Sequence, residues 1–149
     1  MLEFLINGTG WIGFALTLNR IAVGLFFLFS GYNKLFNAQR HLALTNELRS
    51  LHVPAIGFNQ WWVPAVEFIG GAAVLVGFLA PVAALGLLVI IIVAVITSGP
   101  SRVKLYKPID QTDRVDDWLF LPETLYAVML FIIVCGGGGR LSLDALLWG

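Results

Sequence analysis

Long, continuous apolar runs dominate the pattern of hydrophobic and polar positions along this chain. A membrane-spanning helix needs about 20 mostly apolar residues, and four segments have this character. None of them shows the period-two alternation that is typical of a membrane β-barrel strand. The pattern therefore predicts an all-α fold, an integral membrane four-helix bundle that forms a single domain over residues 1–149. The predicted spans are residues 11–36, 61–79, 81–98 and 117–135.

The connections between these spans differ in character. Leu42, Leu48 and Leu51 recur at helical spacing between charged residues, which predicts a short amphipathic helix over residues 39–51 that lies on the membrane. The second and third spans follow each other with almost no linker, so they should form a tight antiparallel hairpin. Residues 98–116 are polar and proline-containing, and we expect a loop there.

The composition supports a membrane protein. The chain is 58% hydrophobic and 12% charged, whereas a soluble domain is usually about 45–50% apolar and about 25% charged. Its 9 basic and 9 acidic residues balance, so charge gives no reason to expect a nucleic-acid partner. The single cysteine, Cys135, excludes an internal disulfide. No His/Cys cluster has the spacing of a metal site, so we predict no metal. We also predict no covalently bound cofactor. The composition predicts a lipid bilayer as the surroundings.

Basic residues indicate an orientation. Four spans place both termini on one side of the membrane and the two longer loops on the other. Short loops rich in Lys and Arg favour the cytoplasm. We therefore expect the loops in the cytoplasm and both termini outside. We also expect the membrane to be a bacterial inner membrane. The basic residues on the loop side are Lys34, Arg40, Arg49, Arg102, Lys104, Lys107 and Arg114.

Ionisable residues inside the predicted spans are the candidates for function. A charge at the centre of a membrane helix costs about 2.5–3.5 kcal/mol, so such residues normally face the bundle and find a partner. Arg20, Glu67 and Glu123 lie within spans, and Lys34 lies at a helix end. The last three belong to one layer on the loop side, where Lys34 could pair with either acid or snorkel to the interface.

Two interpretations are open for Arg20 and two for Glu67. Arg20 either snorkels to the interface on the side of the termini or turns inward to clamp an anion or polar head group. Glu67 is either part of a structural ion pair or an acid that transfers protons or binds a ligand. Glu67 should in either case point into the bundle, within reach of Lys34, Glu123 or a polar group of the first span.

The C-terminal segment should return to the start of the first span. Gly136–Gly139 can turn sharply, because glycine adopts positive φ at little cost. Ser142 can then cap a short helix, with Asp144 in its first turn. We therefore expect Arg20 to interact with this segment and to form a direct structural pair with Asp144. In the competing interpretation, Asp144 only caps the helix, and Arg20 snorkels past Asp144 to the interface.

Several short motifs resemble the DoxX family of small four-helix membrane proteins, which includes DoxD-like quinone-linked subunits. The resemblance covers about residues 14–147, although the charged segment before the fourth span matches no family motif. The motifs are Arg20-x3-Gly24-x6-Gly31-x2-Lys34, Pro64-x2-Glu67-x2-Gly70-Gly71-x5-Gly77, Glu123 at the start of the last span, and Gly139, Arg140, Ser142 and Asp144 in the tail.

The resemblance implies a membrane-embedded subunit of a quinone-linked oxidoreductase system, one that binds quinone or anchors a redox partner. Arg20, Lys34, Glu67 and Glu123 would bind the ligand, and Glu67 and Glu123 are the candidates for a catalytic role, which stays unassigned. Other subunits, a soluble redox partner or a second copy of the chain are the expected protein partners. The alternative is a structural or assembly subunit without a catalytic role of its own. A solute carrier ranks last, because no repeats with broken helices occur.

Overall fold

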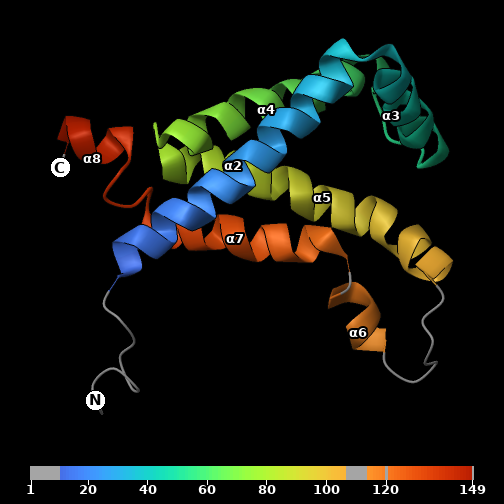
Figure 1. Ribbon diagram of the computed structural model, residues 1–149. Helices are drawn as coiled ribbons and strands as arrows, with labels where there is room; N and C mark the ends of the chain where they lie inside the picture. Colours follow the sequence, from blue (N-terminus) through green and yellow to red (C-terminus); the bar gives the residue numbers. More distant parts are fainter. Residues whose placement is uncertain (1–10, 107–113, 120, 149) are drawn as a thin grey trace.

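The computed structural model describes residues 11–106, 114–119 and 121–148, and their regular secondary structure is helical (Figure 1). Four longer helices run side by side, and three shorter ones lie at the two ends of the bundle. In chain order the helices are α2 (Ile12–Phe36), α3 (Ala38–Ser50), α4 (Ile56–Val76), α5 (Ala80–Tyr106), α6 (Arg114–Leu119), α7 (Pro122–Gly136) and α8 (Leu143–Trp148).

The bundle has two distinct ends, which Figure 1 shows at opposite sides of the molecule. The loop end holds α3, the C-terminal part of α5, α6 and the start of α7. The tail end holds the start of α2, the α4–α5 connection, the end of α7 and α8. The start of α2 and helix α8 therefore lie at the same end, as an even number of long helices requires.

Glycines bring α2 and α4 into backbone contact. A Cβ atom added to Gly31 would lie 2.4 Å from the backbone nitrogen of Phe68, and one added to Gly71 would lie 2.4 Å from that of Leu28. Small residues allow membrane helices to approach this closely. The close contact between α2 and α4 therefore depends on glycine at both positions.

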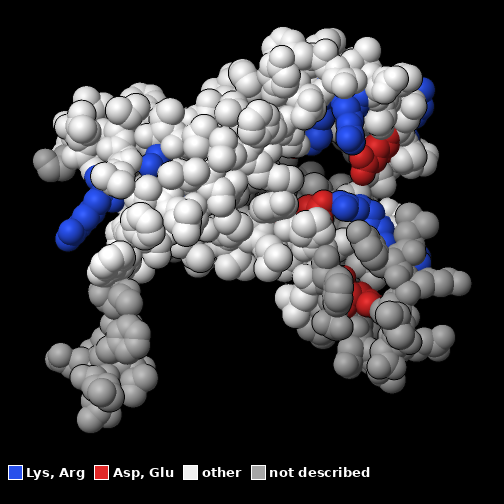
Figure 2. Space-filling view, in the orientation of Figure 1, with Lys and Arg blue, Asp and Glu red and all other residues white. Residues whose placement is uncertain are grey.

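The hydrophobic core is small, and many large apolar side chains face outward. On α5, for example, Val82, Leu85, Val89, Ile92, Val93 and Ile96 are exposed. On the face shown in Figure 2, charged side chains gather at the two ends of the bundle and leave an uncharged region between them. The buried core residues come from α2, α4, α5 and α7: Val23, Phe27, Val74, Ala80, Ala84, Leu87, Ile91, Leu130 and Ile133.

Within the described part of the chain, two helices have the length and apolar composition needed to cross a membrane, Ile12–Phe36 and Ala80–Lys104. Pro122–Gly136 is apolar but shorter. The first predicted span, residues 11–36, agrees with α2. The helices at the other three predicted spans have different boundaries, and a four-span count stays a prediction.

Helix α4 is shifted towards the N-terminus relative to the predicted span, residues 61–79. It begins at Ile56, so Pro64 lies inside the helix rather than in its first turn. It ends at Val76 because Gly77 adopts the left-handed conformation, with φ of 73°, which terminates helices and favours glycine. The sequence shows this glycine but not that the helix stops there.

Helix α5 continues beyond the predicted span, residues 81–98, and passes through Pro100 to Tyr106. The predicted loop over residues 98–116 is therefore wrong for residues 98–106 and 114–116, which are helical, whereas residues 107–113 lie outside the described part of the chain. Proline removes one backbone donor from a helix, but neighbouring serine hydroxyls bind carbonyls nearby: Ser98 donates to Ala94 at 2.8 Å and Ser101 donates to Ser98 at 2.8 Å. An ion pair described below fixes the extension to α7.

The fourth predicted span, residues 117–135, is divided into α6 and α7. The break occurs at Leu121, whose backbone is extended, with φ of −70° and ψ of 124°. The residue before a proline disfavours helical geometry, and Pro122 then takes the first helical position of α7. Helix α7 has 15 residues, which is fewer than the predicted span.

Helix α3 confirms the short helix predicted over residues 39–51. Asn37 caps its start, because the side-chain oxygen accepts hydrogen bonds from the backbone nitrogens of Gln39 and Arg40 at 3.0 and 3.3 Å. None of its residues is buried, and it lies across the loop end of the bundle (Figure 1). Its position on a membrane surface stays a prediction.

Candidate functional site

Glu67 on α4 points into the bundle and binds two groups of α2. The Lys34 ammonium group lies 2.7 Å from each oxygen of the Glu67 carboxylate, and the Ser30 hydroxyl donates to one of them at 3.0 Å. Glu67 is only 5% exposed, so the charge is buried and paired. The prediction that Glu67 would lie within reach of Lys34 or a polar group of the first span is confirmed.

Glu123, in the first turn of α7, forms a second ion pair with Arg102 on α5. We did not expect Arg102 in the site, because the sequence was interpreted as a loop after Ser98. A helix that continues past Pro100 places Arg102 one turn beyond Ser98, so the helical period was the missed signal. The second oxygen of Glu123 is buried and accepts no hydrogen bond from the described residues.

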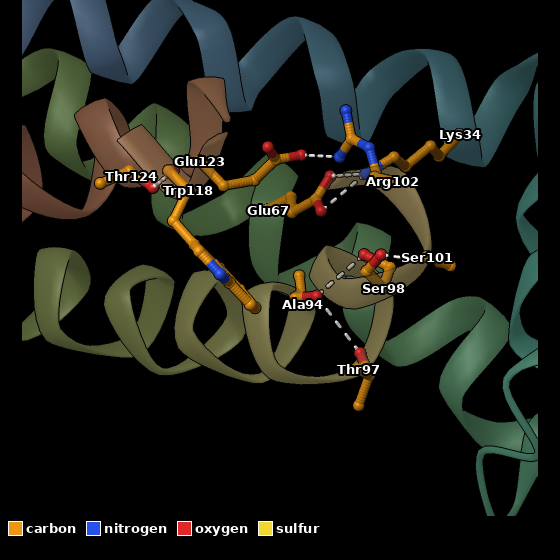
Figure 3. Close-up of polar contacts among 10 residues, drawn as sticks. All are labelled: Lys34, Glu67, Ala94, Thr97, Ser98, Ser101, Arg102, Trp118, Glu123 and Thr124. Carbon is orange, nitrogen blue, oxygen red and sulfur yellow. Dashed lines mark hydrogen bonds and ion pairs between the residues drawn. The ribbon is translucent and has the colours of Figure 1, made fainter. Parts of the chain in front are cut away.

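These four residues, Lys34, Glu67, Arg102 and Glu123, form what we call the ionic cluster. Figure 3 shows the two carboxylates and the Arg102 guanidinium gathered in the same space between the helices. Each residue comes from a different long helix, in the order α2, α4, α5 and α7. The two formal positive charges balance the two negative ones. The cluster therefore ties α2 to α4 and α5 to α7 at the loop end without excess charge.

Two pockets meet at the ionic cluster, since its four residues line both of them. The larger has a volume of about 450 Å³ and lies between α3, α4 and α5. The smaller has a volume of about 270 Å³. In Figure 2, charged side chains surround a hollow at this end of the molecule. The larger pocket has an aliphatic lining of Leu44, Leu48, Leu51, Val63, Val89 and Val93.

The smaller pocket has an aromatic wall. Phe26, Phe27 and Tyr126 line it beside the ionic cluster. The rings of Phe26 and Tyr126 are stacked, with centroids 3.9 Å apart and an interplanar angle of 21°. The ionic cluster thus stands between an aliphatic and an aromatic pocket, an arrangement suited to a ligand with a polar ring and an apolar substituent.

Arg20 lies at the tail end and takes no part in the ionic cluster. It is 3% exposed, and its guanidinium donates hydrogen bonds to the carbonyl oxygens of Leu75 at 2.6 Å, Val74 at 3.3 Å and Leu141 at 2.8 Å. The predicted contact between Arg20 and the C-terminal segment is confirmed by the bond to Leu141. Arg20 does not snorkel to the interface, because its guanidinium binds backbone carbonyls of the bundle itself.

The direct Arg20–Asp144 pair predicted from the sequence is not formed. The Asp144 carboxylate instead accepts hydrogen bonds from the backbone nitrogens of Leu79 at 2.7 Å and Ala80 at 2.8 Å. The start of α5 leaves unsatisfied N–H groups that compete for the carboxylate. Ser142 caps α8 as predicted, since its hydroxyl oxygen accepts from the backbone nitrogen of Ala145 at 3.1 Å.

A comparison with known protein families matches residues 15–99 to the DoxX family. The chain belongs to the DoxX family. It is accordingly a membrane protein, in agreement with its exposed apolar surface. The region of this DoxX chain that matches contains Arg20, Lys34 and Glu67, whereas Glu123 and Asp144 lie beyond it. Comparisons with curated proteins and with solved structures find no match.

The described residues contain no group of three or more His, Cys, Asp or Glu side chains that could hold a metal ion. The ionic cluster and the adjacent Ser30 hydroxyl together offer two cationic donors, two carboxylates and one hydroxyl group. These groups can bind polar oxygens and can accept or release protons.

Proposed function

We propose that this chain is a membrane subunit of a quinone-linked oxidoreductase system and that it binds the quinone ring at the ionic cluster. The observation that carries the proposal is the position of the cluster, between an aliphatic pocket and an aromatic one. The DoxX family, which is often linked to quinone oxidoreductase systems, supports the same assignment.

The residues present fit such a ligand. A quinone has a flat ring, carbonyl oxygens that accept hydrogen bonds, and an apolar tail. Lys34 and Arg102 would donate to the carbonyl oxygens, and the stacked rings of Phe26 and Tyr126 would contact the ring. Val89 and Val93 line the larger pocket and are also exposed on the outer face of α5, so a tail leaving there would enter lipid.

The two carboxylates of the cluster would manage protons. Reduction of a quinone to its hydroquinone takes up two electrons and two protons. Glu67 and Glu123 would hold or pass these protons beside the ring oxygens, because general acids and bases act within hydrogen-bond reach. The electrons would come from another subunit or a soluble redox partner anchored to the chain. Arg20, at the opposite end, is proposed to have a structural role instead.

Ligand extraction tests the proposal. The protein is purified in mild detergent, and co-purifying quinone is quantified by mass spectrometry for the wild type and for Lys34→Met. Arg49→Met serves as a matched control, because Arg49 is an exposed cation of α3 outside the cluster. We expect the Lys34 variant to lose most of the quinone and the control to keep it. Equal quinone content in all three proteins, or none in the wild type, contradicts the proposal.

The alternative function is a structural or assembly subunit, and one observation favours it. The Lys34–Glu67 pair joins α2 to α4, and the Arg102–Glu123 pair joins α5 to α7, so each pair also fastens two helices together. In that case the chain would form a stable complex with other subunits, or with a second copy of itself, that contains no quinone. Mass spectrometry of proteins from the same preparation distinguishes the two functions.

We further propose that α2, α4, α5 and α7 all cross a bacterial inner membrane as one domain, with the loop end in the cytoplasm. Thiol labelling tests this orientation in a Cys135→Ala background. Ser50→Cys places a thiol at the loop end, and Arg140→Cys places one at the tail end; both positions are exposed. We expect a membrane-impermeant reagent added to intact cells to label Arg140→Cys alone.

A further inference from the structure

The hydrogen bonds of the ionic cluster leave one acceptor unused. Glu67 is fully engaged, because its carboxylate accepts from Lys34 and Ser30. Glu123 is not: one oxygen binds Arg102, while the other is buried and receives no donor from the described residues. A buried carboxylate oxygen without a donor is costly, so this position favours a ligand group that carries a hydrogen.

Donors remain beside this acceptor. A guanidinium has five N–H groups, and Arg102 uses one nitrogen for Glu123. Both residues line each of the two pockets. A ligand oxygen that touches Glu123 and Arg102 together therefore meets an acceptor and a donor, which is the complement of a hydroxyl group. A carbonyl oxygen complements Arg102 but offers nothing to Glu123.

Resting on the proposed quinone site, we propose that the cluster binds the reduced, hydroxyl-bearing ring, the hydroquinone, more tightly than the quinone. A ring hydroxyl of the hydroquinone donates to the second oxygen of Glu123 and accepts from Arg102. The quinone presents carbonyl oxygens, which are acceptors only, and leaves the Glu123 oxygen without a partner. Glu123 therefore discriminates between hydroquinone and quinone, whereas Lys34 and Arg102 can donate hydrogen bonds to both.

The test compares two probes of matched shape. A benzoquinone with a decyl tail and its hydroquinone are titrated separately into the detergent-solubilised wild type under anaerobic conditions, and binding is measured by calorimetry. Because the hydroquinone gains one hydrogen bond to a charged group, we expect it to bind about tenfold more tightly or better. This comparison needs no variant and stands on the wild type alone.

Glu123→Gln makes the test specific. Arg102 requires an acceptor, so it should retain the amide oxygen and leave the amide NH₂ group at the position of the unused oxygen. That group donates to a carbonyl, and the preference should therefore disappear or reverse towards the quinone. Asp117→Asn is the matched control, because Asp117 is an acid of α6 that lines neither of the two pockets. It should leave the ratio of affinities unchanged.

The outcomes separate this inference from the proposed function. If both probes bind the wild type with equal affinity, or if Glu123→Gln preserves the hydroquinone preference in a protein that melts like the wild type, the inference is overturned while quinone binding stands. Water would then satisfy the second oxygen of Glu123. If neither probe binds, the proposed function fails together with the inference.

Discussion

The carboxylate of Asp144 accepts a hydrogen bond from the backbone nitrogen of Ala80 at 2.8 Å, so α8 supplies a cap for the start of α5. The other carboxylate oxygen accepts from Leu79 at 2.7 Å, and the backbone nitrogen of Asp144 donates to Gly77 at 2.9 Å. Three bonds therefore tie one residue of the C-terminal segment to the α4–α5 connection.

Removal of this cap should destabilise the bundle. Loss of an N-cap side chain costs about 0.5–2 kcal/mol, and we expect Asp144→Ala to lower the free energy of unfolding by an amount in that range. Asp144→Asn keeps one oxygen acceptor and should lose less. Thermal unfolding in detergent measures both variants. A melting temperature of Asp144→Ala equal to that of the wild type would contradict the cap.

Arg20 and Asp144 should be coupled although no ion pair or hydrogen bond joins them directly. Both hold the C-terminal segment, Arg20 through Leu141 and Asp144 through Leu79 and Ala80. Once one tie is lost, the segment can move away and the other tie weakens. The losses of Arg20→Ala and Asp144→Ala should therefore be less than additive, with a coupling of at least about 0.5 kcal/mol. Strict additivity in a double-mutant cycle would indicate two independent ties.

Gly71→Ala should disrupt the α2–α4 contact. The added Cβ would lie 2.4 Å from the backbone nitrogen of Leu28, and a backbone atom cannot move aside as a flexible side chain can. Overpacking of this kind costs about 1–3 kcal/mol or more. Gly86→Ala is the control, because it also lies within a long helix but has no atom within 4 Å of the added Cβ. We expect thermal unfolding to separate the two variants clearly.

Because Lys34 and Glu67 are paired, we expect a double variant of this pair to be more stable than the single variant Lys34→Met. Removal of one partner from a buried pair costs about 3–5 kcal/mol; Lys34→Met should cost less than this, because its side chain is 29% exposed. The double variant Lys34→Met/Glu67→Gln contains no unpaired charge and should recover part of the loss. A double variant less stable than Lys34→Met alone would contradict a charge-pairing role for these residues.

The sequence predicted the parts of the fold that depend on long apolar runs and on local spacing. The first span agrees with α2, and the short helix α3 lies where its leucines indicated. The contact between Glu67 and Lys34 was also expected, because a deep charge requires a partner and the two residues belong to one layer. These features follow from the cost of exposing polar groups to lipid.

The remaining features depend on tertiary contacts that no short segment reveals. Pro100 and the polar residues around it indicated a loop, whereas α5 continues and brings Arg102 to Glu123. Opposite charges at the tail end suggested an ion pair between Arg20 and Asp144. Each side chain instead binds backbone groups at helix ends, and those groups carry no signature in the residue types.

The cap on α5 also affects the order in which parts of the fold are completed during synthesis. Ala80 and Asp144 are 64 positions apart, so at about 5–20 residues per second Asp144 is synthesised roughly 3–13 s after Ala80. During that interval α4 and α5 can form and associate, but Leu79 and Ala80 still lack their acceptor. The tail end is therefore completed late in biogenesis, after the residues that form the α4–α5 connection have already left the ribosome.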